Sequence, residues 1–451
     1  MAGRRGPSLP RSTVVRYALG SLGTGGFATL PGLVLVYYLT DTLGVAALIA
    51  GAAVTGAKIW DVVIDPVIGG LSDRAYAKRG SRRGPMLIGI IGLPIFFIAT
   101  FAVPAGLPPA AAALWVLIAF ILASTCFSLF QVPYIALPAE LTGSYFARTH
   151  LLTWRVVVLT AAILIFGGGG PEIRGLAGDP HLGYLLMALC AGMLLLAGTW
   201  AALTIVPQHP APEAPAASAA RVPLFDDYRS GWQVLRDSQP FRALLATFVI
   251  QGLTTGLMLA AAQFVARWLL HDEGAVTILF VCLIAPALLV APVWKAVAGR
   301  VGKERAFVIA SVLFLTANVS SIPLIWLPGY WIIGPIVLAG AAYAGMQTLP
   351  MAMLPDVITV DARTRGDRAG AFGGVWTAGE TAGMALGSTL LTLVLAAAGY
   401  VSSTAEATAM QPPAALTGIA CSFSVIPALL MVLSLVTLSR YRLTQAEVED
   451  D

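Results

Sequence analysis

Twelve long apolar stretches follow one another along the chain, separated by shorter polar segments. A membrane-spanning helix needs about 20 mainly apolar residues to cross about 30 Å of hydrocarbon. Stretches that meet this requirement lie at residues 17–38, 45–71, 85–103, 111–137, 151–170, 183–206, 241–270, 274–298, 306–327, 330–354, 370–398 and 415–438. The pattern predicts an all-α polytopic membrane protein with twelve transmembrane helices.

A polar interruption rich in Pro and Ala, at residues 207–238, divides these stretches six and six. We therefore expect a six-helix bundle over residues 1–206 and a central cytoplasmic loop over 207–240. A second six-helix bundle is expected over residues 241–440, followed by a cytoplasmic tail over 441–451.

The two sets of six share local motifs at matching positions. The second stretch contains Trp60-Asp61 and leads into a basic loop, and the eighth contains Trp294-Lys295 and does the same. The fourth ends in Gln131-Val-Pro133, and the tenth in Gln347-Thr-Leu-Pro350. These matches indicate an internal duplication, which is typical of alternating-access carriers with a site between two halves. The expected fold is the major facilitator architecture, with two pseudo-repeated halves.

Composition narrows the class of protein further. Hydrophobic residues make up 58% of the 451 residues and charged residues 11%, against roughly 45–50% and about 25% in soluble domains. These values exclude a soluble enzyme, a disulfide-rich secreted scaffold and a disordered chain. The cysteines lie in apolar stretches without a CxxC pair, and the histidines are scattered, so we expect neither a metal site nor a cofactor.

Charge gives the orientation. With both termini inside, the inner segments hold 22 of the 27 basic residues, and the outer loops hold only Arg174 and Arg267. This distribution follows the positive-inside rule loop after loop. It predicts a multi-pass protein of the plasma (inner) membrane with both termini cytoplasmic, and it explains the basic surplus without a nucleic-acid partner. The long first apolar stretch argues against a cleavable signal.

Two carboxylates in the second span are the strongest candidates for function. Asp61 and Asp65 are spaced i, i+4 and share one helix face with Lys58. Poorly hydrated carboxylates this close must share a proton, bind a cation or pair with a base. They suit a coupling-ion site, and a static ion pair is the structural alternative. The absence of an oxygen ligand at Ile64 favours a proton over sodium slightly.

Other polar residues within the spans are candidates for solute contact. Arg155 follows Trp154, so the pair is expected either to clamp a solute or to anchor a helix at the interface. Glu380 lies among small residues and is expected to move protons or to remain a neutral hydrogen-bonded acid. Gln251 and Gln347 fit either a hydroxylated solute or hydrogen bonds between helices.

The motifs resemble those of the glycoside–pentoside–hexuronide:cation symporters, the melibiose permease branch of the major facilitators. The resemblance rests on residues 58–74 with Arg82-Arg83, on Gln131-Val-Pro133-Tyr134 through Glu140 and Arg148, and on Asp356-Val357 through Arg368. It implies cation-coupled solute uptake, with the cation at Asp61 and Asp65 and with Ser128 as the ligand from span four.

The resemblance also shows departures at the sugar site. Gly25 and Gln131 stand where melibiose permeases have sugar-binding aspartates, and Ile135 replaces a stacking tryptophan. The lysine of the family's eleventh span falls near Ala382, while the arginine of span five is kept as Arg155. These changes move the cavity toward a eukaryotic branch of the fold that carries lysophospholipids.

These considerations give three sets of candidate residues. Cation coupling is assigned to Lys58, Asp61, Asp65 and Ser128. Substrate binding is assigned to Gly25, Gln131, Ile135, Trp154, Arg155, Gln251, Gln347, Trp376 and Glu380. Gating is assigned to Asp73, Arg74, Glu140, Arg148, Asp356 and Arg368.

The expected function is secondary active symport of a sugar or glycoside-type solute with H+ or Na+. The expected partners are a small-molecule solute, a monovalent cation and the lipid bilayer, with the protein as a monomer. A lysophospholipid or amphiphile symporter is the first alternative. The remote one is a membrane prenyltransferase, because Asp61-x-x-x-Asp65 has the spacing of aspartate-rich motifs that hold magnesium pyrophosphate. That enzyme needs a second such motif, for which Asp226-Asp227 is a poor match.

Overall fold

Helices form nearly all of the chain that the structure describes. This computed structural model describes residues 9–142, 145–207, 224–365, 368–405, 407 and 409–443, without the side chains of residues 66, 73, 139, 145–146, 149, 224–230, 364 and 369–370. The α-helices are α1 (Arg11–Leu19), α2 (Ser21–Asp41), α3 (Ala47–Arg79), α4 (Arg83–Phe101), α5 (Pro109–Leu141), α6 (Tyr145–Gly175), α7 (Pro180–Leu203), α8 (Leu224–Asp237), α9 (Gln239–Phe264), α10 (Ala275–Val301), α11 (Lys303–Ser320), α12 (Ile333–Arg365), α13 (Ala369–Ala397), α14 (Pro413–Phe423) and α15 (Val425–Leu438). Three short helical segments, η1 (Val265–Leu269), η2 (Ile322–Ile325) and η3 (Tyr330–Ile332), continue or connect them.

The twelve predicted spans are confirmed within the described residues. Twelve helices are long and apolar enough to cross a membrane, and each overlaps one predicted stretch. The first combines α1 and α2, and the last combines α14 and α15. The largest differences are at α3 and α12, which continue past the predicted ends at residues 71 and 354 to Arg79 and Arg365. The last turns of both helices carry charged residues, so a prediction from hydrophobicity alone places the helix ends too early.

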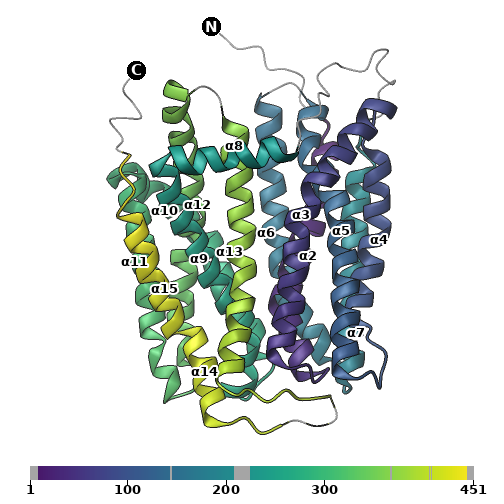
Figure 1. Cartoon of the computed structure of the whole chain (residues 1–451), viewed down its shortest axis with the longest axis vertical. Coiled ribbons are helices and arrows are strands. Elements are labelled where there is room, and N and C mark those ends of the chain that lie inside the picture. Colours follow the sequence, from purple (N-terminus) through teal and green to yellow (C-terminus); the bar gives the residue numbers. More distant parts are fainter. Residues whose placement is uncertain are drawn as a thin grey trace.

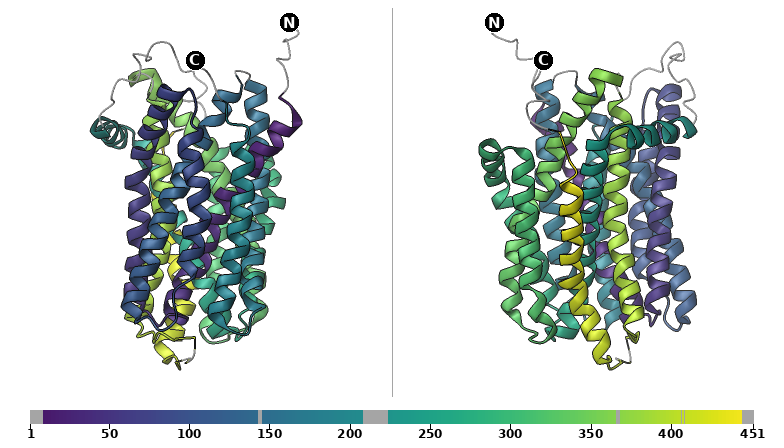
Figure 2. Two further views of the ribbon diagram at one scale, coloured as in Figure 1. Left: turned by 90° about the vertical axis from the view of Figure 1, so that its right-hand side faces the viewer. Right: turned by 60° about the vertical axis from the view of Figure 1, so that its left-hand side comes forward.

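The helices form two bundles side by side (Figure 1). Helices α1–α7 make the N-terminal half and α9–α15 the C-terminal half, and the start of α1 and the end of α15 lie at the same end of the molecule (Figures 1 and 2). We call this end the termini end, and the opposite end, where α14 lies, the far end. Asp61 and Asp65 lie near the middle of α3, which runs from the far end to the termini end.

The segment expected as a central loop contains helix α8, which lies across the bundles near the termini end (Figure 1). Val234 of α8 is buried, whereas Trp232 is 70% exposed. Helix α8 is amphipathic and has only 14 residues, so it lacks the long apolar stretch by which spanning helices are recognised in a sequence. The side chains of Asp226 and Asp227 lie outside those described.

Contacts between the halves gather in the far-end part of the molecule. The Thr55 hydroxyl on α3 lies 2.5 Å from that of Thr389 on α13. Thr277 on α10 donates a 3.2 Å hydrogen bond to the carbonyl of Gly168 on α6. The Tyr37 ring on α2 meets that of Phe264 on α9 at 5.2 Å. The hydrogen bonds between halves that join two described residues lie at this level or nearer the far end.

Glycines let some helices approach backbone to backbone. A Cβ added to Gly387 of α13 would collide with the backbone of Gly256 and Leu257 on α9. A Cβ at Gly25 of α2 would come within 2.7 Å of the Ala162 side chain on α6. Such small-residue crossings are typical of membrane helices, whose association depends on close packing rather than on a hydrophobic driving force.

Candidate functional site

The structure brings the four residues assigned to cation coupling together where α3 packs on α5. Lys58 Nζ lies 3.3 Å from one carboxylate oxygen of Asp61, one helical turn away. The Lys58 ammonium also lies over the rings of Phe27 and Phe120, 6.0 and 5.6 Å from their centres. The ammonium is therefore held by one carboxylate and two aromatic faces, which fixes its position beside Asp61.

Two acidic groups at this site have different surroundings. The Oδ1 atom of Asp61 is buried and has no hydrogen-bond partner among the described residues. Asp65 is exposed, and the buried Ser128 hydroxyl of α5 donates a hydrogen bond to its carboxylate. A buried carboxylate oxygen without a partner is costly, and a bound cation or proton would satisfy it. The arrangement therefore provides a carboxylate, a hydroxyl and an unpaired oxygen for a small cation.

The substrate candidates of the N-terminal half differ in what they offer. Gln131 accepts a 2.7 Å hydrogen bond from Thr24 on α2. Arg155 lies over the Tyr134 ring, 5.5 Å from its centre, and its Nε atom is buried without a described partner. The side chains of Ile135 and Trp154 are about half exposed.

Gly25 occupies a different environment from these neighbours. It is enclosed between α2 and α6, where no side chain larger than hydrogen fits. Gly25 therefore allows α2 and α6 to pack closely in this conformation. An aspartate side chain, which melibiose permeases have at this position, would have no room here.

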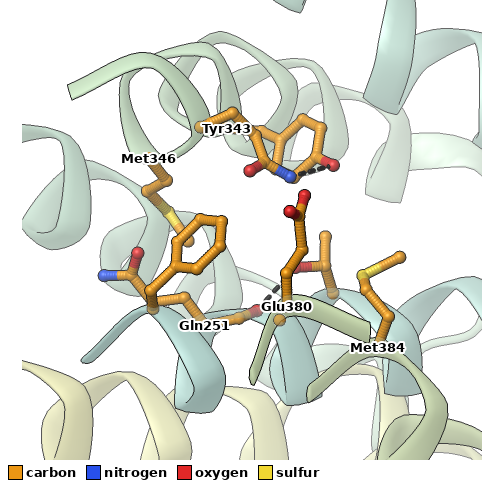
Figure 3. Close-up of a pocket in the computed structure, with 9 residues that line it drawn as sticks. Gln251, Tyr343, Met346, Glu380 and Met384 are labelled. Carbon is orange, nitrogen blue, oxygen red and sulfur yellow. Dashed lines mark hydrogen bonds between the residues drawn. The ribbon is translucent and has the colours of Figure 1, made fainter. Parts of the chain in front are cut away.

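The C-terminal half holds a small pocket around Glu380, which Figure 3 shows with Tyr343, Met346 and Met384 on its walls. Its volume of about 10 Å³ has room for about one water molecule. Gln347 also lines it and donates a 2.5 Å hydrogen bond to the Tyr343 hydroxyl. The Glu380 carboxylate points from α13 toward Tyr343 (Figure 3). The pocket thus presents an acid, an amide and a phenol to whatever enters it.

Gln251 and Trp376 are held mainly by helix packing. Gln251 lines the same pocket but donates to the hydroxyls of Ser311 and Ser434, at 2.9 and 3.3 Å, on α11 and α15. Trp376 is 2% exposed and stacks on Phe248 with 4.5 Å between ring centres. In this conformation both side chains stabilise the C-terminal half from within.

Two of the gating candidates form equivalent ion pairs in the two halves. Glu140, near the end of α5, lies 2.6 Å from the Arg82 guanidinium that precedes α4. Asp356, on α12, lies 2.6 Å from the ammonium of Lys303 at the start of α11. Each pair joins the segment after one span to the end of another, which is the placement expected for duplicated halves.

The other gating candidates also lie near the termini end. Arg368 pairs with Asp361 at 2.8 Å and with Asp237 at 3.0 Å, which fastens α8 to the start of α13. These carboxylates raise the pKa of Arg368, which stays charged. Arg148 donates to the carbonyl of Thr142, and Arg74 is exposed. The side chain of Asp73 lies outside those described.

A charged cluster at the far end is absent from our candidate lists. Arg174 on α6 reaches Glu273 of the other half at 3.3 Å, and Asp41 accepts a 2.5 Å hydrogen bond from Tyr400 of the other half. A signal for it is present in the sequence, because Arg174 is one of only two basic residues that the topology places outside. The sequence does not show why Arg174 is there, because its partner, Glu273, lies 99 residues away.

Comparisons with known proteins agree with this architecture. The family model described as MFS/sugar transport protein matches residues 16–445. An uncharacterized symporter of Synechocystis is 24% identical, over 96% of this chain and 94% of its own. A glucuronide carrier protein homolog of Escherichia coli is 23% identical, over 97% and 94%. The sodium-dependent lysophosphatidylcholine symporter 1 of Mus musculus is 24% identical, over 72% and 66%.

A solved structure gives the same fold. The crystal structure of a D-xylose–proton symporter superposes with a TM-score of 0.65 and covers 93% of this chain and 96% of its own, at 14% identity. The match confirms the twelve-helix fold class. With the family model covering almost the whole chain, these findings exclude the enzyme alternative: the chain belongs to the MFS/sugar transport protein family and is a multi-pass membrane symporter of the major facilitator type.

Proposed function

We propose that this transporter couples solute movement to a cation held at Asp61 and Asp65. The observation that carries the proposal is the buried, unpartnered Oδ1 of Asp61, one turn from the exposed Asp65 carboxylate and its Ser128 donor. A coupling site must load from one side and empty to the other, so it needs ligands that are neither fully satisfied nor fully solvated. The three oxygen-bearing side chains meet that requirement.

The proposed orientation has the termini end in the cytoplasm, in the plasma (inner) membrane. The positive-inside distribution supports this assignment. All described hydrogen bonds between the halves lie toward the far end, so the conformation corresponds to a carrier closed to the outside. In this conformation, Asp65 of α3 and Glu380 of α13 are both exposed.

We propose a proton rather than sodium as the coupling ion. Sodium prefers several oxygen ligands, and the ammonium of Lys58 occupies one oxygen of Asp61. The positive charge of Lys58, 3.3 Å from Asp61, opposes the binding of a metal cation there. A proton needs a single oxygen, and Asp65 offers one in contact with a hydroxyl. If uptake depended on sodium, sodium would replace the proton as the proposed coupling ion.

The proposed solute is a sugar or glycoside-type molecule, carried by a monomer. Gln131, Arg155 and Glu380 supply the amide, guanidinium and carboxylate that hydroxylated solutes use. The E. coli relative named as a glucuronide carrier homolog supports the same class.

A lysophospholipid or other amphiphile is the second candidate. Gly25 is closed by α6, and Ile135 presents a half-exposed apolar surface where the resemblance expects a stacking tryptophan. The mouse relative named as a lysophosphatidylcholine symporter adds to this candidate. Either solute class leaves the cation site unchanged.

Uptake into proteoliposomes with an imposed pH gradient separates the two candidates. We expect pH-driven accumulation of at least one labelled glycoside and none of lysophosphatidylcholine. Accumulation of the lysolipid alone would overturn the glycoside assignment and retain the symporter. Absence of pH-driven or sodium-driven movement for both classes would contradict the proposed function as stated.

A further inference from the structure

The far-end cluster joins the two halves through two separate contacts. The Arg174 guanidinium donates to Glu273 of the other half at 3.3 Å and to the Tyr184 hydroxyl of its own half at 3.0 Å. It also covers the rings of Tyr184 and Tyr37. Only 6% of the Arg174 side chain is exposed. A charge so deeply buried needs a partner in every state that the protein visits.

The second contact is a hydrogen bond from Tyr400 to Asp41 across the same interface. Asp41 also accepts a 2.6 Å hydrogen bond from Thr40 of its own half. Burial and the Asp41 carboxylate both raise the pKa of Tyr400, so this hydroxyl keeps its proton and acts as the donor. Tyr400 also accepts a 2.9 Å bond from the indole N–H of Trp268 within its own half.

Backbone pairing closes the same end. Residues 401–405, which we call the strap, leave the C-terminal half and pair with the end of α2. The amide of Ser403 donates to the carbonyl of Thr40 at 2.9 Å, and that of Ala405 to Thr42 at 3.1 Å. Leu43 and Thr404 form an antiparallel bridge. The strap, visible at the bottom of Figure 1, must leave α2 if the halves separate here.

Behind the strap lies a pocket of about 520 Å³ on whose wall all these charges meet. The N-terminal half contributes Arg174 and Asp41, and the C-terminal half contributes Arg267, Glu273 and Asp272. Arg267 pairs with Glu273 at 2.6 Å inside the C-terminal half. Asp272 accepts a 2.5 Å bond from Tyr330, also inside that half.

If the halves separate, the groups of the C-terminal half keep partners within their own half. Glu273 keeps Arg267, and Tyr400 keeps Trp268. Arg174 loses Glu273 at the same moment that Asp41 loses Tyr400, and these two opposite charges share one pocket wall with Tyr37 and Tyr184. No other acid of the N-terminal half lines that pocket among the residues described.

We propose that this cluster is the outer gate of the carrier and works by partner exchange, with Arg174 moving from Glu273 to Asp41 when the far end opens. Asp41 then binds Tyr400 of the other half in the closed state and is the counter-ion of Arg174 in the open state. The inference rests on the proposed alternating access, and it assigns positioning roles to residues outside the coupling and solute sites. Exchange keeps a buried arginine paired throughout the cycle, so opening does not expose an unpaired charge to a poorly hydrated interface.

The test uses a reporter cysteine behind the strap. Thr42 is 4% exposed and lines the pocket, so the cysteine of a Thr42→Cys variant reacts with a membrane-impermeant thiol reagent only when the far end opens. The reagent is added outside intact cells, without solute, and the chain lacking Thr42→Cys gives the background from its four native cysteines. Because no solute is involved, the reading does not depend on the solute class or on the coupling ion.

Two substitutions in the reporter background distinguish exchange from a simple latch. Tyr400→Phe removes the bond to Asp41, which exists only in the closed state, and also the bond from Trp268, which Tyr400 accepts within its own half in both states. Since only the first bond holds the halves together, we expect labelling to become about tenfold faster, the size of a hydrogen bond to a charged group. Asp41→Asn removes that charged bond and also the open-state partner of Arg174, so we expect no acceleration. Equal acceleration by both would overturn partner exchange, and no acceleration by Tyr400→Phe would overturn the gate itself.

The chain offers matched controls. Tyr330→Phe and Asp272→Asn change the same two residue types in a tyrosine–aspartate pair at the same end, but that pair lies within one half. We expect both to leave the labelling rate within about twofold of the reporter parent. A change as large as that of Tyr400→Phe would contradict the assignment of the gate to the contact between halves. Uptake by the same variants, measured separately, reports whether the symport function is intact.

Discussion

At the scale of single residues, the proposed cation site depends on the different surroundings of two neighbouring carboxylates, Asp61 and Asp65. Asp61 has one oxygen against Lys58 and the other buried without a partner, whereas Asp65 is exposed and is contacted by Ser128. The i, i+4 spacing is readable from the sequence, and so is the choice of Ser128 through the family resemblance. What the sequence does not contain is which oxygen stays free, because that depends on where α5 places its side chains against α3.

Removal of the Ser128 hydroxyl tests this arrangement. Ser128→Ala is expected to lower the apparent affinity for the coupling cation by about tenfold or more with little change in maximal rate, because a hydrogen bond to a charged group contributes about 1.5–3 kcal/mol. The measurement is solute uptake as a function of external cation concentration. Ser124→Ala, one turn earlier with a buried hydroxyl that has no described partner, is the control and should leave that affinity unchanged.

At the scale of helices, close crossings decide which glycines tolerate a side chain. On α13, Gly387 meets the backbone of α9, whereas a Cβ at Gly374 of the same helix would meet nothing within 4 Å. Sequence reasoning found small residues near Glu380 but could not separate packing glycines from open ones. The same limit applies to Gly25, which the resemblance assigned to the solute site and which the structure places between α2 and α6.

A pair of alanine substitutions measures the difference. Gly387→Ala should destabilise the protein by about 1–3 kcal/mol, since overpacking forces helices apart. Gly374→Ala should be neutral or stabilising by up to about 1 kcal/mol, because alanine restricts the unfolded chain and favours helix. Thermal unfolding of the purified proteins in detergent gives the comparison. Equal losses for both variants would mean that the α9–α13 crossing is not the sensitive contact.

At the scale of the whole molecule, the two halves meet toward the far end, whereas the described ion pairs Arg82–Glu140, Lys303–Asp356 and Arg368–Asp361 near the termini end each stay within one half. Twelve spans and the division into halves followed from apolar stretches and repeated motifs, because both are local properties of the chain. Helix α8 and the far-end cluster did not, since an amphipathic helix evades a hydrophobicity test and Asp41 finds Tyr400 359 residues away. Contacts between halves are also properties of one conformation, so a sequence specifies them only indirectly.

Locking the far end should therefore stop the transport cycle. Leu43 and Thr404 face each other in an antiparallel bridge, where Cα atoms lie about 4.5–5.5 Å apart, within the range that a disulfide requires. Oxidation of the Leu43→Cys, Thr404→Cys double variant is expected to reduce uptake at least tenfold, and reduction should restore it. Each single variant is the control. Full activity of the oxidised, cross-linked protein would contradict opening at this end.

The most direct test of the central claim is proton movement triggered by solute, compared between the parent protein and Asp65→Asn. Proteoliposomes that enclose a pH-sensitive dye would be given the transported solute without any imposed gradient. We expect the parent to acidify the lumen on solute addition. The folded Asp65→Asn protein is expected to bind or equilibrate solute without a proton signal and without accumulation against a gradient. If Asp65→Asn still moves protons with solute, or still concentrates solute, the assignment of coupling to Asp61 and Asp65 is wrong.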